Sequence, residues 1–445
     1  MNSLRNLPKI DKLLVKPQLA HCNPLHVKPI AQKAVDELRK KLQKAEIESF
    51  DEEALVEQIK AQYEALLAPS LVPLVNATGV IVHTNLGRSC LSPELLKRAH
   101  ECLSNYTNLE YDLENGCRGE RYAHVSRHLR TLLGVEDVLV VNNNAAAVFL
   151  ILNTLAMGKE SIVSRGELVE IGGSFRVPDV MARSGSKLVE VGTTNKTRIG
   201  DYNAAITDET AMLMKVHRSN FSIEGFSEEA SMEEITNLAQ KRGVLDYYDL
   251  GSAYITPLPY GLSHAEPSLH QILANEPTLV SFSGDKLLGG VQAGIIVGKK
   301  SLIQALKKNQ LLRMLRVDKL TLALLEESAK AYLNDELHLI PTLNLLHRGI
   351  PTLETIAKRL RCKIGAQMCD ILHSHTYVGG GTMPNRPIPT VALHVKGNAK
   401  NLERKFRAHG AIGRIESDKF LLDLRALLPQ SEARLVEIAK KVLEC

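Results

Sequence analysis

The chain contains 445 residues, of which 44% are hydrophobic and 24% are charged. These are the proportions of a globular protein with a large buried core, and they exclude a disordered chain. The longest apolar stretch, 145–157, is interrupted by Asn153 and Thr154 and is too short to cross a bilayer, and the first residues lack the apolar core of a secretion signal. We therefore expect a cytoplasmic protein without a membrane segment.

The cysteines predict neither a disulfide framework nor a metal site. The seven cysteines are scattered, and they form no Cys-x-x-Cys pair and no Cys/His cluster with zinc spacing. Cys362 and Cys369 are expected on one helix, where both would be packing residues. We therefore expect reduced thiols and no structural metal.

Residues 1–70 are expected to form a small, basic, helical domain. Residues 1–44 contain ten Lys or Arg against three Asp or Glu, an excess of seven positive charges, whereas the rest of the chain sums to −2. A long helix is predicted over 30–67, and Pro69 and Pro73 then mark a domain boundary. The charge excess suggests a polyanionic partner, although charge alone is explained equally well by a solvated helix face.

From about residue 74, short β-branched runs alternate with helical stretches such as 145–157 and 232–242. This pattern predicts an α/β fold, a mostly parallel sheet sandwiched by helices, in a large domain at 71–330. Because chemistry in such sheets gathers beyond the carboxyl ends of strands, each polar cluster after a strand is a candidate site. The strands are predicted at 138–141, 161–164, 187–191, 211–216, 244–249, 278–282 and 294–297.

A smaller α+β domain is predicted at 331–445. A helix at 319–333 leads into it, and it contains strands at 390–395 and 420–424 and a last helix from Ser431.

Lys286 is the most informative candidate residue. It follows an apolar strand within the stretch SFSGDKLLGG at 281–290. A lysine in such a Ser/Gly-rich turn can form a Schiff base with pyridoxal phosphate (PLP), while Ser283 and backbone amides hold the phosphate. On this short pattern alone, an exposed loop lysine is the simpler interpretation.

Asp249 ends another apolar strand, 37 residues before Lys286. A PLP enzyme needs a carboxylate beside the pyridinium nitrogen, because the carboxylate keeps the ring protonated as an electron sink. Asp249 would alternatively cap the turn before Gly251. Asp246 is a rival acid, but it lies inside the strand rather than at its end.

Asn142, Asn143 and Asn144 follow a third strand and begin a helix. Free backbone amides and the helix dipole favour phosphate at such a position, and capping of the helix by asparagine is compatible with that role. A phosphate cradle, an acid and a lysine in this chain order are the arrangement of the aspartate-aminotransferase-like PLP enzymes, which are called fold type I.

Five longer stretches carry a specific resemblance: NATGVIVHTNLGR (76–88), NLEYDLE (108–114), IGGSFR (171–176), KVH (215–217) and SFSGDKLLGG (281–290). They resemble one family, bacterial selenocysteine synthase, the L-seryl-tRNA(Sec) selenium transferase. The likeness covers nearly the whole chain, from the basic N-terminal segment to Asp423-Leu-Arg425. Local departures are Cys117, in a turn where a charged or polar residue is expected, and Val291, where proline is expected.

The resemblance implies roles for individual residues. Lys286 would carry PLP, and Asp249 would pair with the pyridine nitrogen. Arg88, Arg313 and Arg316 would bind the anionic selenium donor, a task that suits the planar and permanently charged guanidinium. Without the family, a solvent-facing helix is the simpler interpretation of Arg313 and Arg316.

His217 follows the strand 211–216 and is expected to contact the cofactor, with a core histidine, Ser219 and Asn220 as alternatives. Arg425 occupies a position where many relatives bind a substrate carboxylate. Because the carboxyl group of seryl-tRNA is esterified, a structural ion pair explains Arg425 at least as well.

The function implied by the resemblance is conversion of L-seryl-tRNA(Sec) to L-selenocysteinyl-tRNA(Sec), with selenophosphate as the donor, through a PLP-bound aminoacrylyl-tRNA. Residues 1–70 would bind the tRNA, and the protein would be a homo-oligomer, typically a ring of dimers. Two alternatives are a PLP-dependent lyase or transferase acting on a free small amino acid or amino sugar, and a tRNA-binding protein on an inactive PLP scaffold. The basic N-terminal segment argues against the first alternative, and the retained lysine, acid and asparagines argue against the second.

Overall fold

The computed structural model describes residues 6–171, 175–223, 225–383 and 385–444. Residue contacts divide the chain into two compact units, Met1–Pro73 and Leu74–Cys445. Across the described ranges, no helix is long and apolar enough to span a membrane.

The first unit is a small helical bundle with its own apolar core. It contains α1 (Ile10–Leu14), α2 (Pro24–Gln43) and α3 (Glu52–Leu67). Leu13 of α1, Ala31 of α2 and Ile59 of α3 are fully buried against one another's helices. The unit therefore has a core that does not depend on the rest of the chain.

The single helix predicted over 30–67 is wrong, because two helices occupy this stretch. The first helix begins at Pro24, where the Asn23 side chain accepts a hydrogen bond from the Leu25 amide, and it ends before Ala45, whose φ is 56°. The side chain of Asp51 then caps the second helix by accepting from the Glu53 amide at 2.9 Å. An acidic cap followed by acidic residues is a strong start signal inside an otherwise helical pattern.

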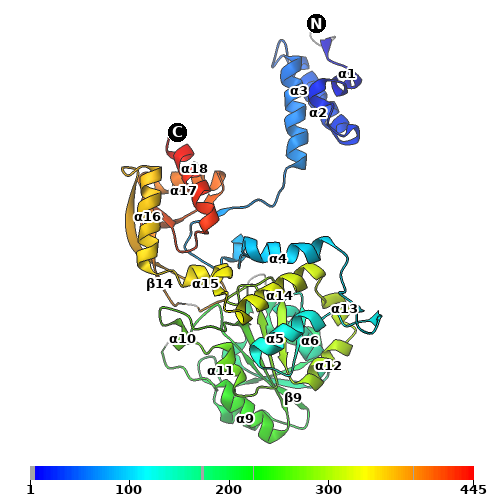
Figure 1. Ribbon diagram of the computed structural model, residues 1–445, viewed down its shortest axis with the longest axis vertical. Coiled ribbons are helices and arrows are strands. Elements are labelled where there is room, and N and C mark those ends of the chain that lie inside the picture. The colour runs from blue at the N-terminus through cyan, green and yellow to red at the C-terminus, as the bar shows by residue number, and fades with distance from the viewer. Residues whose placement is uncertain (1–5, 172–174, 224, 384, 445) are drawn as a thin grey trace. The chain divides into compact units, whose positions relative to one another are not determined.

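The second unit is built on a seven-stranded mixed sheet surrounded by helices (Figure 1). All seven predicted strands are present, with ends that differ by a few residues. Neighbouring strands are parallel except at β12, which is antiparallel to both of its neighbours. In spatial order the strands are β4 (Asp137–Val141), β12 (Gly294–Gly298), β11 (Leu279–Ser283), β10 (Leu245–Ser252), β9 (Thr210–Val216), β5 (Glu160–Ser164) and β8 (Lys187–Val191).

The two faces of this sheet are covered by different helices. Along β9, Met212 and Met214 belong to the larger core, whereas Leu213 belongs to a smaller core with Ile235 and Leu238 of α9 (Met232–Arg242). This alternation follows from the two-residue period of a strand. The larger core also contains residues of α5 (Ala123–Leu133), α6 (Asn144–Leu155) and α14 (Lys319–Leu333), and α14 packs on α5 and on α4 (Pro93–Ser104).

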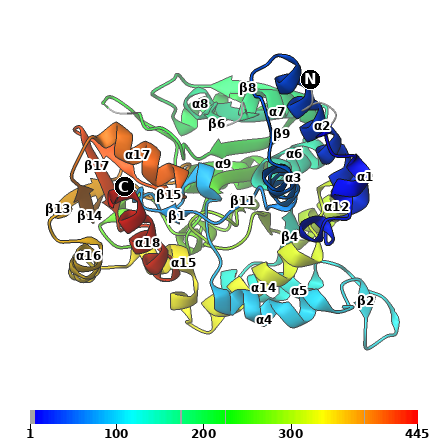
Figure 2. The same cartoon turned by 90° about the horizontal axis from the view of Figure 1, so that it is seen from above.

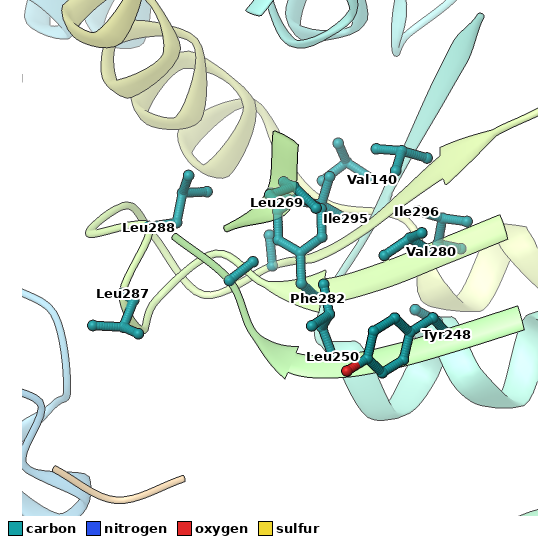
Figure 3. Close-up of a cluster of buried hydrophobic side chains, with 14 of the residues drawn as sticks. Val140, Tyr248, Leu250, Leu269, Val280, Phe282, Leu287, Leu288, Ile295 and Ile296 are labelled. Carbon is teal, nitrogen blue, oxygen red and sulfur yellow. The ribbon is translucent and has the colours of Figure 1, made fainter. Parts of the chain in front are cut away.

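The centre of the larger core lies around β10 and β11. Figure 3 shows Phe282, Val280 and Leu250 from these strands near Ile295 of β12, and it shows Leu287 further to the left, on the turn after β11, in the same core. All five side chains are buried. The turn that carries Lys286 is therefore anchored in the core by the residues on both sides of it.

A four-stranded antiparallel sheet forms the small C-terminal part of this unit, with helices α16, α17 and α18 beside it (Figure 2). Cys369 begins its first strand and is buried, whereas Cys362 lies exposed on α16. The expectation that both cysteines share a helix is therefore wrong. The elements are β13 (Cys369–Thr376), β14 (Ile388–Val395), β17 (Lys419–Asp423), β16 (Arg414–Glu416), α16 (Ile350–Ile364), α17 (Ala399–Ala408) and α18 (Glu432–Leu443).

The start of the second unit is attached to this small sheet region. The short strand β1 (Val75–Asn76) pairs in parallel with β15 (Ala411–Ile412), and Val75 is fully buried in the small core. A few residues further on, Gly79 lies so close to Asp423 that an added Cβ would stand 2.5 Å from the carboxylate carbon. Glycine is therefore required where the chain passes Asp423.

Candidate active site

A cavity of about 220 Å³ lies where the carboxyl ends of β10 and β11 meet the start of α6. Its lining brings together six of the residues predicted from the sequence, although they are up to about 200 positions apart in the chain. A crevice at the carboxyl ends of strands is the place where open α/β sheets bind ligands. The cavity is also lined by Gly251 and Gln292, which were not predicted as site residues, and the six predicted residues are Arg88, Asn143, Asn144, Asp249, Ser283 and Lys286.

Lys286 lies in a tight glycine turn that follows β11. Its side chain is buried, and the Nζ atom is 3.5 Å from the carbonyl oxygen of Gly381. A Cβ at Gly381 would come within 2.8 Å of that Nζ, and the positive φ of 72° at this position also favours glycine. Burial lowers the pKa of Lys286, and the nearby positive charge of Arg88 lowers it further. A lysine with a lowered pKa holds more of the neutral amine that can attack a carbonyl.

Asp249 is buried at the end of β10, where the strand contains an irregularity before Gly251. Its Oδ1 atom accepts hydrogen bonds from Asn144 Nδ2 at 2.7 Å and from the Gly251 amide at 3.2 Å. Burial raises the pKa of Asp249, and these two donors counteract that rise. The carboxylate is therefore held in one orientation at the cavity wall.

Asp246, the rival acid, has a different environment. It lies three positions earlier on β10, so its side chain points to the opposite face of the strand. Its carboxylate accepts from the Thr236 hydroxyl at 2.9 Å and from the Thr278 amide at 3.2 Å. These contacts tie β10 to its neighbours, and they place the carboxylate outside the cavity lining.

The three asparagines have three different environments. Asn143 caps α6, because its side chain accepts from the Ala146 amide at 2.8 Å. Asn144 uses its side-chain amide on Asp249. Asn142 is exposed, its backbone amide donates to the carbonyl of Leu315, and it is not among the lining residues. The three side chains therefore make three separate sets of contacts, and phosphate binding at the start of α6 stays a prediction.

Several buried polar atoms around the cavity have no hydrogen-bond partner among the described residues. They are Asn144 Oδ1, Ser219 Oγ and Ser252 Oγ. Ser219 lies beside Gly251, at 3.4 Å from an added Cβ. Buried polar atoms in native proteins are almost always paired, so such a group indicates a polar ligand. Together with the lysine, the buried acid and the helix start, they fit PLP, which has a ring nitrogen, a ring hydroxyl and a phosphate.

His217 lies at the end of β9 and lines a second cavity of about 180 Å³ rather than the one that contains Lys286. Its Nε2 atom is 3.4 Å from Glu266, and its backbone amide donates to the carbonyl of Asp249 at 2.8 Å. His217 is therefore attached to the acid through the backbone. A direct contact of its ring with the cofactor stays a prediction.

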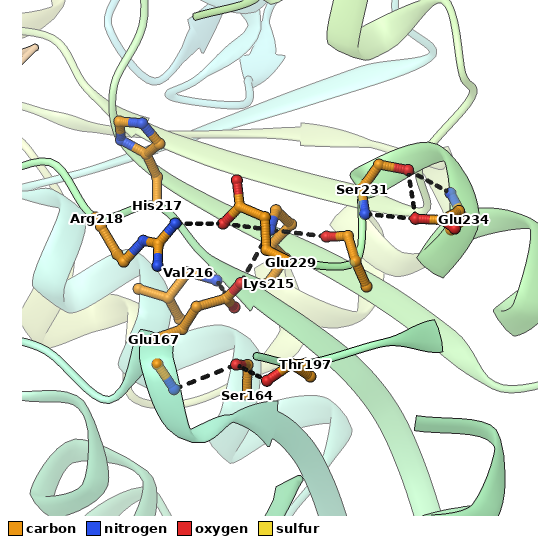
Figure 4. A network of polar contacts seen from close by, with 12 residues as sticks. Ser164, Glu167, Thr197, Lys215, Val216, His217, Arg218, Glu229, Ser231 and Glu234 are labelled. Carbon is orange, nitrogen blue, oxygen red and sulfur yellow. Dashed lines mark hydrogen bonds and ion pairs between the residues drawn. The ribbon is translucent and has the colours of Figure 1, made fainter. Parts of the chain in front are cut away.

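A buried polar network fixes the end of β9 (Figure 4). Glu167 accepts from Lys215 Nζ at 2.9 Å and from the Val216 amide at 2.9 Å. Lys215 also lies 3.6 Å from Glu229, which pairs with Arg218 at 2.6 Å. Because breaking a buried ion pair is costly, this network holds the strand end beside Asp249 in one position.

The three predicted donor arginines are divided between two cavities. Arg88 lines the Lys286 cavity and pairs with Asp285 at 3.0 Å. Arg313 and Arg316 line a separate cavity of about 330 Å³ with Glu110 and Arg121. Within one chain, the side chains of Arg313 and Arg316 therefore do not share the cavity that contains Lys286.

Arg425 is fully buried and is held by backbone carbonyls rather than by the ion pair considered from the sequence. Its guanidinium donates to the carbonyl oxygens of Leu345, Arg348 and Pro389 and lies 5.2 Å from the ring of Tyr260. These contacts join the small sheet region to the segment before α16.

Sequence reasoning missed Asp285 and Gln292, and it recognised Gly381 only as part of a turn or close-approach site, with no role in the cavity. The position of Asp285 next to Lys286 and the run Gly379-Gly-Gly381 were the available signals. The central residues of the stretch 171–176, residues 172–174, lie outside the described residues.

The sheet order, the buried lysine after β11 and the buried acid at the end of β10 define a PLP-dependent transferase of fold type I, as predicted. The solved structure of D-glucosaminate-6-phosphate ammonia-lyase shares this fold, with a TM-score of 0.61 and 19% identity over 86% of this chain and 98% of that chain.

The model of the L-seryl-tRNA selenium transferase family matches residues 74–428. The chain is 56% identical over 445 residues to the L-seryl-tRNA(Sec) selenium transferase of Nautilia profundicola, which covers 100% of this chain and 99% of the relative. It is 52% identical over 448 residues to that of Aliarcobacter butzleri, with 100% and 99% covered. The chain belongs to the L-seryl-tRNA selenium transferase family, which confirms the resemblance found in the sequence.

Proposed function

We propose that the protein converts L-seryl-tRNA(Sec) to L-selenocysteinyl-tRNA(Sec), with PLP as cofactor and selenophosphate as selenium donor. The observation that carries this proposal is identity of 56% to a named selenium transferase along the full chain, residues 1–73 included. An enzyme acting on a free small amino acid or amino sugar would not need the basic N-terminal unit, so that alternative is not favoured.

The geometry supports specific tasks for the residues of the cavity. PLP, when bound, provides an electron sink for the negative charge that develops at the serine Cα. Lys286 would remove the Cα proton, since its lowered pKa favours the neutral amine. Asp249 would hold a proton at the ring nitrogen, with Asn144 and Gly251 fixing its carboxylate. The amides at the start of α6, with Ser283, would bind the phosphate.

The arginines are proposed to serve the selenium donor. Arg88 is already in the cavity, where Asp285 orients its guanidinium. Arg313 and Arg316 lie in a neighbouring cavity of the same chain, and the backbone next to them bonds to Asn142 through the carbonyl of Leu315. Guanidinium groups bind phosphate-like oxygens with two parallel hydrogen bonds, which suits selenophosphate.

The N-terminal unit is proposed to bind the tRNA. Lys28, Lys33, Lys40 and Lys41 of α2 are all exposed. The side chains of the same helix that are buried in the bundle are Val27, Ala31, Ala34 and Val35. A basic helical surface suits a folded RNA, which proteins recognise mainly through shape and backbone contacts. We further propose that the enzyme works in the cytoplasm as a homo-oligomer, a ring of dimers, as the family resemblance implies.

A substrate comparison tests the function. Purified protein with PLP and selenophosphate is incubated with seryl-tRNA(Sec) or with free L-serine, and the released amino acid is analysed by mass spectrometry after ester hydrolysis. We expect selenocysteine only from the tRNA-bound serine. Turnover of free serine, or no turnover of either substrate, would contradict the proposal.

A further inference from the structure

The loop that carries Arg88 has an unusual backbone. It follows a short 3-10 turn (Thr84–Leu86), and both Gly87 and Arg88 have positive φ, 91° and 62°. For a residue with a long side chain such a conformation is unfavourable and persists only where surrounding contacts over-determine it. Something other than local preference therefore holds this loop.

The contacts that hold it converge on the next residue, Ser89. Its hydroxyl lies 2.8 Å from the carbonyl oxygen of Asp285 and 2.7 Å from that of Lys286, and its amide donates to the same Asp285 carbonyl at 3.2 Å. Its oxygen accepts in turn from the Thr342 hydroxyl at 3.2 Å. Three segments that are far apart in the chain are thus joined at one hydroxyl.

These bonds connect the two basic side chains of the cavity, those of Arg88 and Lys286. The backbone of Asp285 and Lys286 is held by Ser89, and the Asp285 carboxylate is held by the guanidinium of Arg88. Two neighbouring residues of the loop therefore hold two neighbouring residues of the turn. The Arg88 side chain binds the Asp285 side chain, and the Ser89 side chain binds the backbone carbonyls of Asp285 and Lys286. A change at Ser89 releases the loop at the point nearest to Arg88.

We propose that Ser89 is a positioning residue that fixes the Arg88 guanidinium relative to the Lys286 amine, so that the donor-binding arginine and the lysine act as one rigid unit. This inference rests on the proposed function and deepens it. Serine suits the task because a single hydroxyl donates towards the turn and accepts from Thr342. Alanine retains only the backbone bond.

The test is a pH titration of the cofactor absorbance in the holoenzyme, which requires no selenium transfer. The charged groups that act on Lys286 are Arg88, Asp249 and Asp285. The positive charge of Arg88 disfavours protonation of the Lys286 nitrogen. Displacement of the Arg88 guanidinium in Ser89→Ala therefore raises the titration midpoint. At a fixed pH near the midpoint we expect the ratio of protonated to unprotonated Lys286 nitrogen to rise roughly twofold or more. A factor of about two is the lower end of the effects that contacting residues have on one another.

Three further variants make the test specific. In Arg88→Ala the midpoint also rises, and adding Ser89→Ala to it causes no further rise, because Ser89 acts through Arg88. Ser92→Ala is the matched control, since Ser92 caps α4 by accepting from Leu95 at 3.2 Å and does not contact the turn. If Ser89→Ala does not bind PLP, Thr342→Val, which removes the donor to Ser89, is expected to shift the midpoint in the same direction.

Two results would overturn the inference: a midpoint in Ser89→Ala equal to that of Ser92→Ala, or shifts that add in the double variant. Failure of the proposed function has a different signature, namely a wild-type holoenzyme that titrates normally but forms no selenocysteinyl-tRNA.

Discussion

The hydrogen bond from Asn144 to Asp249 allows a quantitative prediction. It joins the start of α6 to the end of β10 across 105 residues, its length is 2.7 Å, and the acceptor is 4% exposed. Hydrogen bonds to charged groups contribute about 1.5–3 kcal/mol. In Asn144→Ala, the PLP affinity or the rate of a step that needs the ionised carboxylate should therefore fall by roughly 10- to 150-fold, since about 1.4 kcal/mol corresponds to a factor of ten.

The same substitution has a pH signature with a defined sign. Burial raises the pKa of Asp249, and the Asn144 amide opposes that rise by stabilising the ionised form. Without Asn144 the pKa rises further, so Asp249 keeps its proton to higher pH. PLP affinity and Cα proton exchange of the bound substrate should both fall, and the acid limb of the exchange rate should move to higher pH.

The assay compares Asn144→Ala with Asn153→Ala on the same helix. Asn153 donates to the carbonyl of Ser184 at 3.1 Å and is not in the cavity lining, so its loss affects stability without touching the acid. PLP affinity is measured by absorbance titration, and proton exchange by mass spectrometry in deuterated water. If both variants show the same affinity and the same acid limb, the reasoning about Asn144 is refuted.

Three further predictions concern stability, the donor and the tRNA. Because burial raises the pKa of Asp249, the folded protein without PLP binds that proton more tightly than the unfolded chain, and the contribution of Asp249 to stability is lost as pH rises from about 3.9 through the raised pKa. Asp249→Asn should therefore raise the Tm of the cofactor-free protein at pH 7. Asp246→Asn should lower the Tm, because it weakens hydrogen bonds from Thr236 and Thr278. A lower Tm for Asp249→Asn would contradict this reasoning. Arg313→Ala should retain PLP and the release of the serine hydroxyl but slow selenium incorporation, and loss of PLP would assign Arg313 to the cofactor instead. A chain starting near Ser70 should fold and bind PLP but lose salt-dependent affinity for seryl-tRNA(Sec), and full affinity in a filter-binding titration would refute the role of the N-terminal unit.

Most strands of the large sheet were predictable because they are short apolar runs buried on both faces, whereas the edge strand β8 is mostly exposed or half-buried. Met212 to Val216 and Leu279 to Phe282 are nearly all fully buried, so no alternation obscures them. The break between α2 and α3 was not predicted, since the residues around Ala45 favour helix and only the capping by Asp51 reveals the second start. The buried strand position of Cys369 was missed for a similar reason, because seven-residue spacing also fits a helix.

For the site, chain order and residue type were enough to predict Lys286 and Asp249, which line one cavity. The partners of the asparagines were not predictable, because the bond between Asn144 and Asp249 depends on how α6 and β10 meet in space. The hydrogen bond from Ser89 to the backbone of Lys286 is likewise a tertiary contact between residues nearly 200 positions apart. The sequence alone indicates which side chains follow strands. Which atoms those side chains bond to depends on how the elements pack in the folded protein.

The central claim is that the cavity around Lys286 is the cofactor site, and locating the bound cofactor tests it most directly. The purified holoenzyme is reduced with borohydride, digested, and mapped by mass spectrometry. The account predicts one pyridoxyl adduct, on Lys286. An adduct on another lysine, or a protein that stays colourless after addition of PLP, would contradict it.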